Sequence, residues 1–302
     1  MGYTRRTQVR PPPRPLPGGT LPAVAGAARR PGRARPDGKD MKRKSPDHAR
    51  QTIPTLVAHR GFLHRYPENS WPALKAAARA GACWIECDVQ MCADGSFLLL
   101  HDADFRRTGA DPRSPFALDA RTSQSISVHC PQTLGERFAP TPPPRLEAVL
   151  DWLATQEALR LMVEIKRESL QHFGHEPVIE KLVRALQAQA DRCRLISFDR
   201  KALALARRLG GPEIGWVLPA WNAHHQARAS ELAPASLICN QKRIPPGASL
   251  WPGDWEWMVY DILDADTALA LAARGVKLVE TGDIEQLLAD PRLAPGACPR
   301  DA

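Results

Sequence analysis

The chain has 302 residues, 43% of them hydrophobic, which is enough for a substantial core of the size found in an α/β barrel. The formal net charge of +8 is unevenly spread: residues 1–50 hold 13 Lys and Arg against 3 Asp and Glu, and the remainder holds 28 against 30. A nearly neutral remainder argues against a nucleic-acid-binding domain, and the absence of 18 consecutive apolar residues argues against a transmembrane helix.

The first 50 residues contain nine prolines, scattered arginines and few large apolar side chains, so we expect a disordered basic extension. Arg5-Arg6 raises the alternative of a twin-arginine export signal, but the apolar stretch 21–28 behind it is short and interrupted by proline and glycine. Translation from Met41 is another alternative. We expect the folded domain to occupy residues 51–302.

The cysteines are odd in number and form no Cys-x-x-Cys pair, which is more typical of buried thiols in a reducing compartment than of a disulfide or zinc framework. We therefore expect a cytoplasmic protein. The seven cysteines are Cys83, Cys87, Cys92, Cys130, Cys193, Cys239 and Cys298.

From Thr55 onward, strand-like runs alternate with helix-like runs. The first helix is predicted after Asn69 or Ser70 as its cap, with Leu74 and Ala77 on one face. Later helices are expected at 146–153, 176–190, 200–209, 226–233, 264–274 and 284–289. The strand-like runs are 55–58, 84–89, 97–100, 161–166, 194–198, 213–218, 236–240, 257–262 and 276–281.

This alternation favours a parallel sheet with helices outside it, and about eight strands in roughly 250 residues favour a closed (β/α)8 TIM barrel. An open doubly wound sheet is the rival architecture. Residues 103–144 break the rhythm with many Ser, Thr and Pro residues. We expect a long irregular insertion after the second strand region, lying over the strand ends where a site would form.

Reactive side chains stand where the strand-like runs end: His59 after the first, Glu86 and Asp88 on one face of the second, and His101 after the third. Together with Glu164, the two acids make three carboxylates at the ends of neighbouring predicted strands. Such a set binds a hard divalent cation, Mg²⁺ or Ca²⁺, or consists of ordinary surface acids and ion pairs; the residues alone leave both interpretations open.

The ordered motifs resemble the glycerophosphodiester phosphodiesterase family. They are His59-Arg60-Gly61, Pro67-Glu68-Asn69-Ser70, Glu86-Cys87-Asp88, Asp94-Gly95, His101-Asp102, Phe105 to Gly109, Pro144 to Leu150, and the last two strands with Trp257 and Val279 to Asp283.

The resemblance implies acid/base catalysis by His59 and His101 and a cation held by Glu86, Asp88 and Glu164. It also implies phosphate binding by Arg60 and Lys166. Two further substrate-site residues are expected. Glu68 would hydrogen-bond Arg60 or the substrate, and Trp257 would stack on the glycerol moiety. Met258-Val259-Tyr260 and Gly282 depart from the family pattern, which leaves the choice of substrate open.

The resemblance thus implies hydrolysis of a small-molecule glycerophosphodiester to glycerol 3-phosphate and an alcohol. The alternatives are a lysophospholipase D that acts on lysophospholipids, and a non-catalytic phosphodiester-binding barrel. The oligomeric state stays open.

Overall fold

The computed structural model describes residues 52–296 and 298. The predicted basic extension of residues 1–50 lies outside this part of the chain. The proposed domain boundary near residue 51 therefore stays a prediction.

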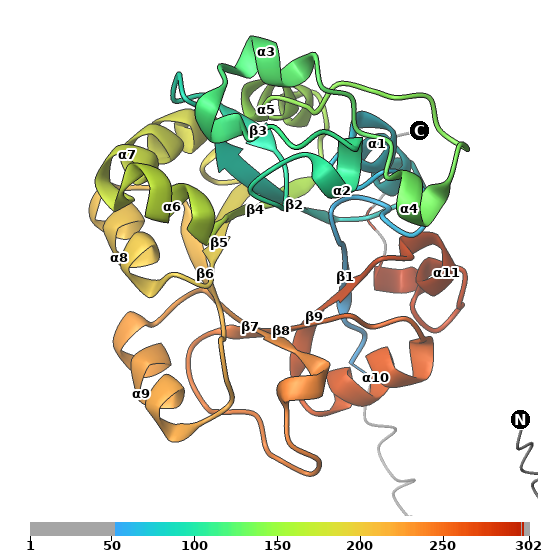
Figure 1. Ribbon diagram of the computed structural model, residues 1–302. Helices are drawn as coiled ribbons and strands as arrows, with labels where there is room; N and C mark the ends of the chain where they lie inside the picture. The colour runs from blue at the N-terminus through green and yellow to red at the C-terminus, as the bar shows by residue number, and fades with distance from the viewer. Residues whose placement is uncertain (1–51, 297, 299–302) are drawn as a thin grey trace, which may run out of the picture. The chain divides into compact units, whose positions relative to one another are not determined.

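Eight parallel strands form a closed barrel, as Figure 1 shows in a view down its axis. Closure follows because β1 pairs with both β9 and β2, so the barrel has no free edge. The TIM-barrel prediction is confirmed and the open sheet is wrong. The barrel strands are β1 (Thr55–Ala58), β2 (Trp84–Met91), β4 (Arg160–Ile165), β5 (Cys193–Ser197), β6 (Glu213–Val217), β7 (Ser236–Asn240), β8 (Glu256–Tyr260) and β9 (Val276–Thr281).

The third strand-like run is not a barrel strand. β3 (Phe97–Leu99) runs antiparallel to the end of β2, so the two form a hairpin that carries His101 back over the barrel.

Helices surround the barrel, and most begin and end near their predicted limits. Ser70 caps α1 by accepting a hydrogen bond from the Ala73 backbone N–H, and Gly81 ends this helix with a φ of 102°. α6 was not predicted, and a 3₁₀ turn, η3 (Gln241–Arg243), stands in the β7–β8 connection. The outer helices are α1 (Trp71–Ala80), α5 (Leu146–Ala154), α6 (Arg167–Phe173), α7 (His175–Leu186), α8 (Arg200–Arg208), α9 (Ala223–Leu232), α10 (Ala265–Ala273) and α11 (Ile284–Leu288).

The core has two layers, because alternate side chains of each strand face the barrel interior and the surrounding helices. Apolar side chains such as Val57, Met162 and Leu278 fill the middle of the barrel. At its amino end, Arg194 pairs with Glu213 and Glu256. Polar side chains of the inward-facing set are thereby restricted to the two ends.

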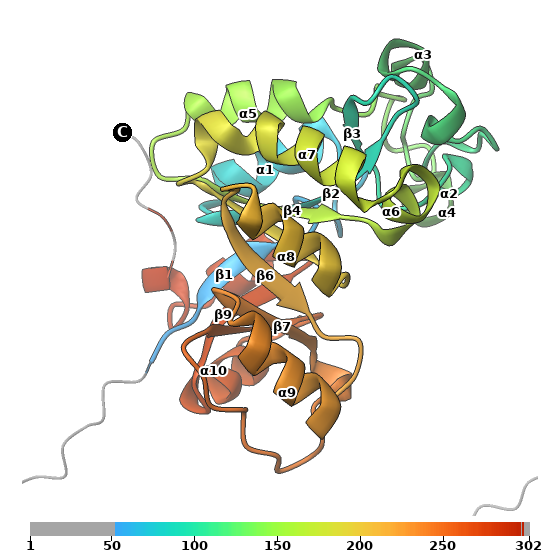
Figure 2. The same cartoon turned by 90° about the vertical axis from the view of Figure 1, so that its left-hand side faces the viewer.

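The insertion at 103–144 is more ordered than the sequence predicts. It contains α2 (Arg106–Gly109), η1 (Pro115–Ala117), α3 (Ala120–Gln124) and α4 (Pro131–Leu134), and the three α-helices gather beside β3 at one end of the barrel (Figure 2). Phe105, Ile126 and Val128 pack against Leu98 in a small separate core. These buried contacts stabilise a segment without helical periodicity.

The expectation of buried thiols holds for five cysteines and is wrong for two. Cys83 and Cys298 form a disulfide across 215 residues, and it attaches the C-terminal segment beside the start of β2.

Within residues 52–296, no helix is long and apolar enough to cross a membrane.

Gly61 offers a test of how tightly the first βα turn packs. Its φ is +77°, and an added Cβ would lie 2.7 Å from the Ala73 carbonyl carbon in α1. Gly210 has a φ of +72° with no heavy atom within 4 Å of its added Cβ. Both Ala variants bear a backbone strain of about 1–2 kcal/mol. We expect Gly61→Ala to lower the free energy of unfolding by about 1–3 kcal/mol more than Gly210→Ala does, because the α1 backbone must move to make room for the new methyl group. Denaturant unfolding measures both, and equal losses would contradict the close packing.

Candidate active site

Inward-facing residues at the carboxyl ends of β1, β2 and β4 build the site. Glu86 and Asp88 lie two residues apart on β2, so both face the interior. Asp88 pairs in register with Glu164 on the adjacent β4, which places the predicted carboxylates side by side. Ligand oxygens of Glu86, Asp88 and Glu164 lie within 4.8 Å of one another.

A cavity of about 190 Å³ opens above these acids. Its walls bring together both predicted catalytic histidines and both predicted phosphate-binding cations. Aromatic and apolar side chains complete the lining. The lining residues are His59, Arg60, Glu86, His101, Glu164, Lys166, Ile196, Phe198, Val217, Ile238, Met258, Tyr260, Asp261 and Glu280.

Asp88 contacts two cations that line this cavity, and their positive charges keep its carboxylate ionised. Its carboxylate contacts Arg60 Nε and Lys166 Nζ, each at 3.1 Å, and accepts a hydrogen bond from Asn69 Nδ2 at 3.0 Å. Burial by itself would raise the pKa of Asp88, but Arg60 and Lys166 hold this pKa well below its usual range.

The negative charges of Glu86 and Glu164 are balanced less well by neighbouring positive groups than the charge of Asp88 is. Burial raises the pKa of Glu86 well above its usual range, and the nearby Asp88 raises it further. Burial also raises the pKa of Glu164, although Lys166 Nζ lies 2.8 Å from its Oε1 and opposes the shift. Glu86 Oε2 accepts a hydrogen bond from the Arg60 backbone N–H, whereas its Oε1 has no partner among the described residues.

These observations fit a hard cation. A buried carboxylate oxygen without a partner, beside two further carboxylates, is the donor set that Mg²⁺ or Ca²⁺ takes. Glu86, Asp88 and Glu164 are therefore the residues that could hold the expected ion.

A chain of ion pairs connects the barrel to the insertion. Glu68 Oε1 accepts from Arg60 at 2.9 Å, and Arg107 of α2 donates to both Glu68 oxygens at 2.6 and 2.8 Å. Arg107 also donates to Asp102 at 2.7 Å, and Asp102 lies 2.6 Å from Nδ1 of His101. The insertion thus holds the carboxylate that orients His101.

Gln90 holds the backbone of the same turn. Its side-chain amide donates to the carbonyls of His101 and Asp102, each at 3.2 Å. Its own carbonyl oxygen accepts from the Ser169 hydroxyl. The position of His101 is therefore tied to β2 itself.

His59 stands at the end of β1, where its backbone N–H donates to the carbonyl of Thr281 on β9. Burial, and then the positive charge of Arg60, lower the pKa of His59 to about 3. Arg60 has a φ of 51° and directs its backbone N–H at Glu86. The imidazole of His59 is accordingly neutral near pH 7.

Three predicted site residues do not line the cavity. Asp88 and Glu68 still contact Arg60, which does, whereas Trp257 faces away from it. Alternation along β8 turns Met258 and Tyr260 inward and Trp257 outward. Its indole is 5% exposed, packs near Trp221 and Trp251, and donates to the Trp251 carbonyl at 3.0 Å. The prediction that Trp257 stacks on the glycerol moiety is therefore wrong, because this side chain packs in the core outside the barrel.

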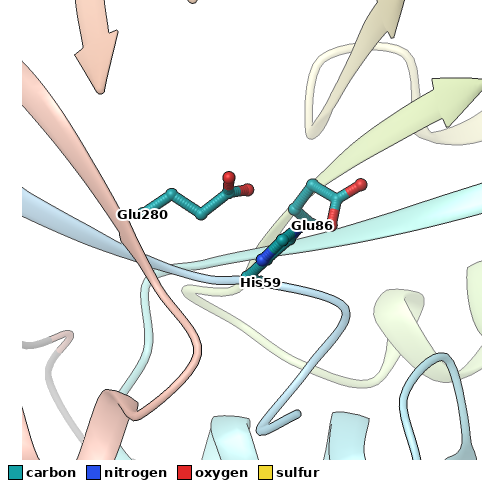
Figure 3. Close-up of side chains that lie close together, drawn as sticks. All are labelled: His59, Glu86 and Glu280. Carbon is teal, nitrogen blue, oxygen red and sulfur yellow. The ribbon is translucent and has the colours of Figure 1, made fainter. Parts of the chain in front are cut away.

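Three residues at the site were not predicted as such. Asn69 was considered as a helix cap, but it exchanges two hydrogen bonds with Asp88 through its side chain. Arg107 stands within the motif 105–109, and its role required knowledge of where α2 lies. Glu280, on β9, is 4% exposed and lies near His59 and Glu86, as Figure 3 shows. Burial and then Glu164 raise the pKa of Glu280 well above its usual range.

Residues 59–237 match the model of the glycerophosphoryl diester phosphodiesterase family. This range spans more than half of the chain and includes both histidines and the three carboxylates. The chain belongs to this family.

Curated relatives share part of the chain. A glycerophosphodiester phosphodiesterase of Caldanaerobacter subterraneus is 30% identical over 156 residues, which is 51% of this chain and 62% of the relative. A protein of the same name from Bacillus altitudinis is 29% identical over 154 residues. The chain thus spans about three fifths of the length of these relatives.

Solved structures share the fold. A family protein of Silicibacter pomeroyi superposes with a TM-score of 0.70 at 17% identity, covering 82% of this chain and 95% of that one. An Oleispira antarctica phosphodiesterase, solved with the product sn-glycerol-3-phosphate, has a TM-score of 0.67 at 22% identity, covering 78% and 96%.

The Asn69–Asp88 contact can be tested by an isosteric change. Asn69→Asp replaces the buried N–H donor with a carboxylate against Asp88, so we expect a loss of about 1–3 kcal/mol or more in unfolding free energy. Asn222→Asp is the matched control, because Asn222 caps α9 through its side-chain oxygen and Asp caps equally well. A similar stability for both variants in denaturant unfolding would refute the role of Asn69.

Proposed function

We propose that the protein hydrolyses glycerophosphodiesters to glycerol 3-phosphate and an alcohol, with a divalent cation and two histidines. The observation that carries this proposal is that one cavity is lined by two histidines, two cations and two of the three clustered carboxylates: His59, His101, Arg60, Lys166, Glu86 and Glu164. Proton-transfer groups, cations for a phosphate and cation ligands thus surround a single space.

The positive side chains explain how a phosphodiester anion would bind among so many acids. Arg60 and Lys166 are held in place by Asp88, Glu68 and Glu164, and both also line the cavity. A cation on Glu86, Asp88 and Glu164 would act as a Lewis acid toward a substrate oxygen. The all-oxygen donor set favours Mg²⁺ or Ca²⁺.

The surroundings of the two histidines support a different role for each. Asp102 contacts Nδ1 of His101, so it stabilises the imidazolium and leaves Nε2 to act as the acid toward the departing alcohol oxygen. His59 makes no side-chain ion pair with a carboxylate in the described chain and acts as the first base. It takes the proton of a glycerol hydroxyl that attacks phosphorus, which releases the alcohol and leaves a cyclic phosphate. Water then opens this cyclic phosphate, with the roles of the two histidines reversed.

The cavity is compatible with more than one alcohol as the leaving group of the phosphodiester. Phe198, Met258 and Tyr260 also line the cavity, and we place the leaving group against these aromatic and apolar side chains. A cytoplasmic location stays a prediction: the five buried thiols fit it, whereas the Cys83–Cys298 disulfide does not.

Removal of either imidazole tests the chemistry. His59→Ala and His101→Ala should each lower kcat by about 10²–10⁴-fold without loss of fold, because each removes a proton-transfer group. A coupled assay of glycerol 3-phosphate release over glycerophosphodiesters and lysophospholipids measures this and identifies the substrate class. His224→Ala, on the exposed face of α9, is the control. Full activity of either test variant would refute the assignment.

Chelation tests the cation. Exhaustive EDTA treatment should abolish turnover, and Mg²⁺ or Ca²⁺ should restore it. The melting temperature should also fall in chelator, because Glu86, Asp88 and Glu164 then face one another without the ion. Turnover that persists in metal-free buffer would exclude a catalytic cation.

A further inference from the structure

The cavity contains a second group of possible cation ligands, and one of its members, Glu280, has no role in the proposed chemistry. One ligand atom each of His59, Glu86 and Glu280 lies within 4.8 Å of the others. Glu86 belongs to this group and also to the group of Glu86, Asp88 and Glu164. Two neighbouring positions for cations therefore share one carboxylate.

The two positions differ in how well the protein neutralises them. Asp88 and Glu164 both contact Lys166 Nζ, and Asp88 also contacts Arg60, so protein cations already compensate these acids. For Glu280, no hydrogen bond or ion pair of its side chain to a Lys or Arg is found among residues 52–296 and 298. The unbalanced charge thus lies on the side of β9.

Two buried oxygen atoms point to a ligand at this place. Glu280 is 4% exposed and Glu86 is 2% exposed, and Oε1 of each lacks a hydrogen-bond partner in the described chain. Figure 3 shows Glu280 extending from its strand toward His59 and Glu86. An unpartnered buried carboxylate oxygen costs free energy that a bound cation recovers.

We propose that His59, Glu86 and Glu280 form a second cation site, selective for a borderline transition ion such as Zn²⁺. One imidazole nitrogen with two carboxylates is a donor set that suits Zn²⁺, whereas the all-oxygen set beside it suits Mg²⁺ or Ca²⁺. A Zn²⁺ ion here occupies the ring nitrogen of His59 that faces the cavity, so this nitrogen no longer accepts a proton. The site is therefore inhibitory.

The effect on turnover rests on the function proposed above, whereas ion binding does not. Zn²⁺ binding is therefore measured first, by calorimetry on the full chain in saturating Mg²⁺. We expect one Zn²⁺ per chain, and X-ray absorption of this form should show one imidazole nitrogen in the zinc shell. No bound Zn²⁺, or a zinc shell of oxygens alone, would overturn the proposal.

Variants then locate the site. Glu280→Gln keeps the side-chain shape and should weaken Zn²⁺ binding at least about tenfold, since even changes outside the ligand shell cost 10–100-fold. Asp261→Asn removes another carboxylate from the same cavity wall and should leave the Zn²⁺ affinity unchanged. Circular dichroism checks the fold, and Glu280→Asp provides a second variant with the charge retained. Unchanged Zn²⁺ binding in Glu280→Gln would overturn the assignment.

Turnover provides the last test. In saturating Mg²⁺, Zn²⁺ should inhibit the unmodified protein, and the concentration for half inhibition should rise in Glu280→Gln by the same factor as the dissociation constant. Zn²⁺ that binds without inhibiting an active enzyme would overturn the inhibitory role. Absence of any phosphodiester hydrolysis would overturn the proposed function instead, and would leave the binding results valid.

Discussion

Four carboxylates inside the carboxyl end of the barrel are the constraint on which the site depends. Glu86, Asp88, Glu164 and Glu280 are all buried, and each charge costs several kcal/mol to remove from water unless it is balanced. Arg60 and Lys166 supply part of that balance. The remaining negative charge is what makes the cavity a place for cations and, through them, for a phosphodiester.

The balance explains local features that otherwise look unrelated. Arg60 adopts a left-handed backbone conformation, which turns its N–H toward Glu86 while its side chain reaches Asp88 and Glu68. Gly61 then lets the chain pass close to α1. Glu68 and Arg107 extend the same network to the insertion. The polar insertion thus orients His101 through Asp102.

The sequence predicts the features that depend on short-range periodicity. Alternation on β2 placed Glu86 and Asp88 on one face, and the succession of strands placed Glu164 next to them, as the register confirms. The inward or outward direction of a strand is harder to predict. β8 is apolar on both faces, so nothing in its pattern shows that Met258 faces the cavity and Trp257 the helices. Arg107 and the Cys83–Cys298 pair depend on long-range folding, for which the sequence has no local signal.

Gln90 has a consequence for how this chain can change in length. Its amide grips the two carbonyls that follow β3, so an added or deleted residue in the tight hairpin of Ala93 to Ser96 would rotate the imidazole out of the cavity. The position of the imidazole therefore constrains the length of a turn that itself contributes no side chain to the cavity.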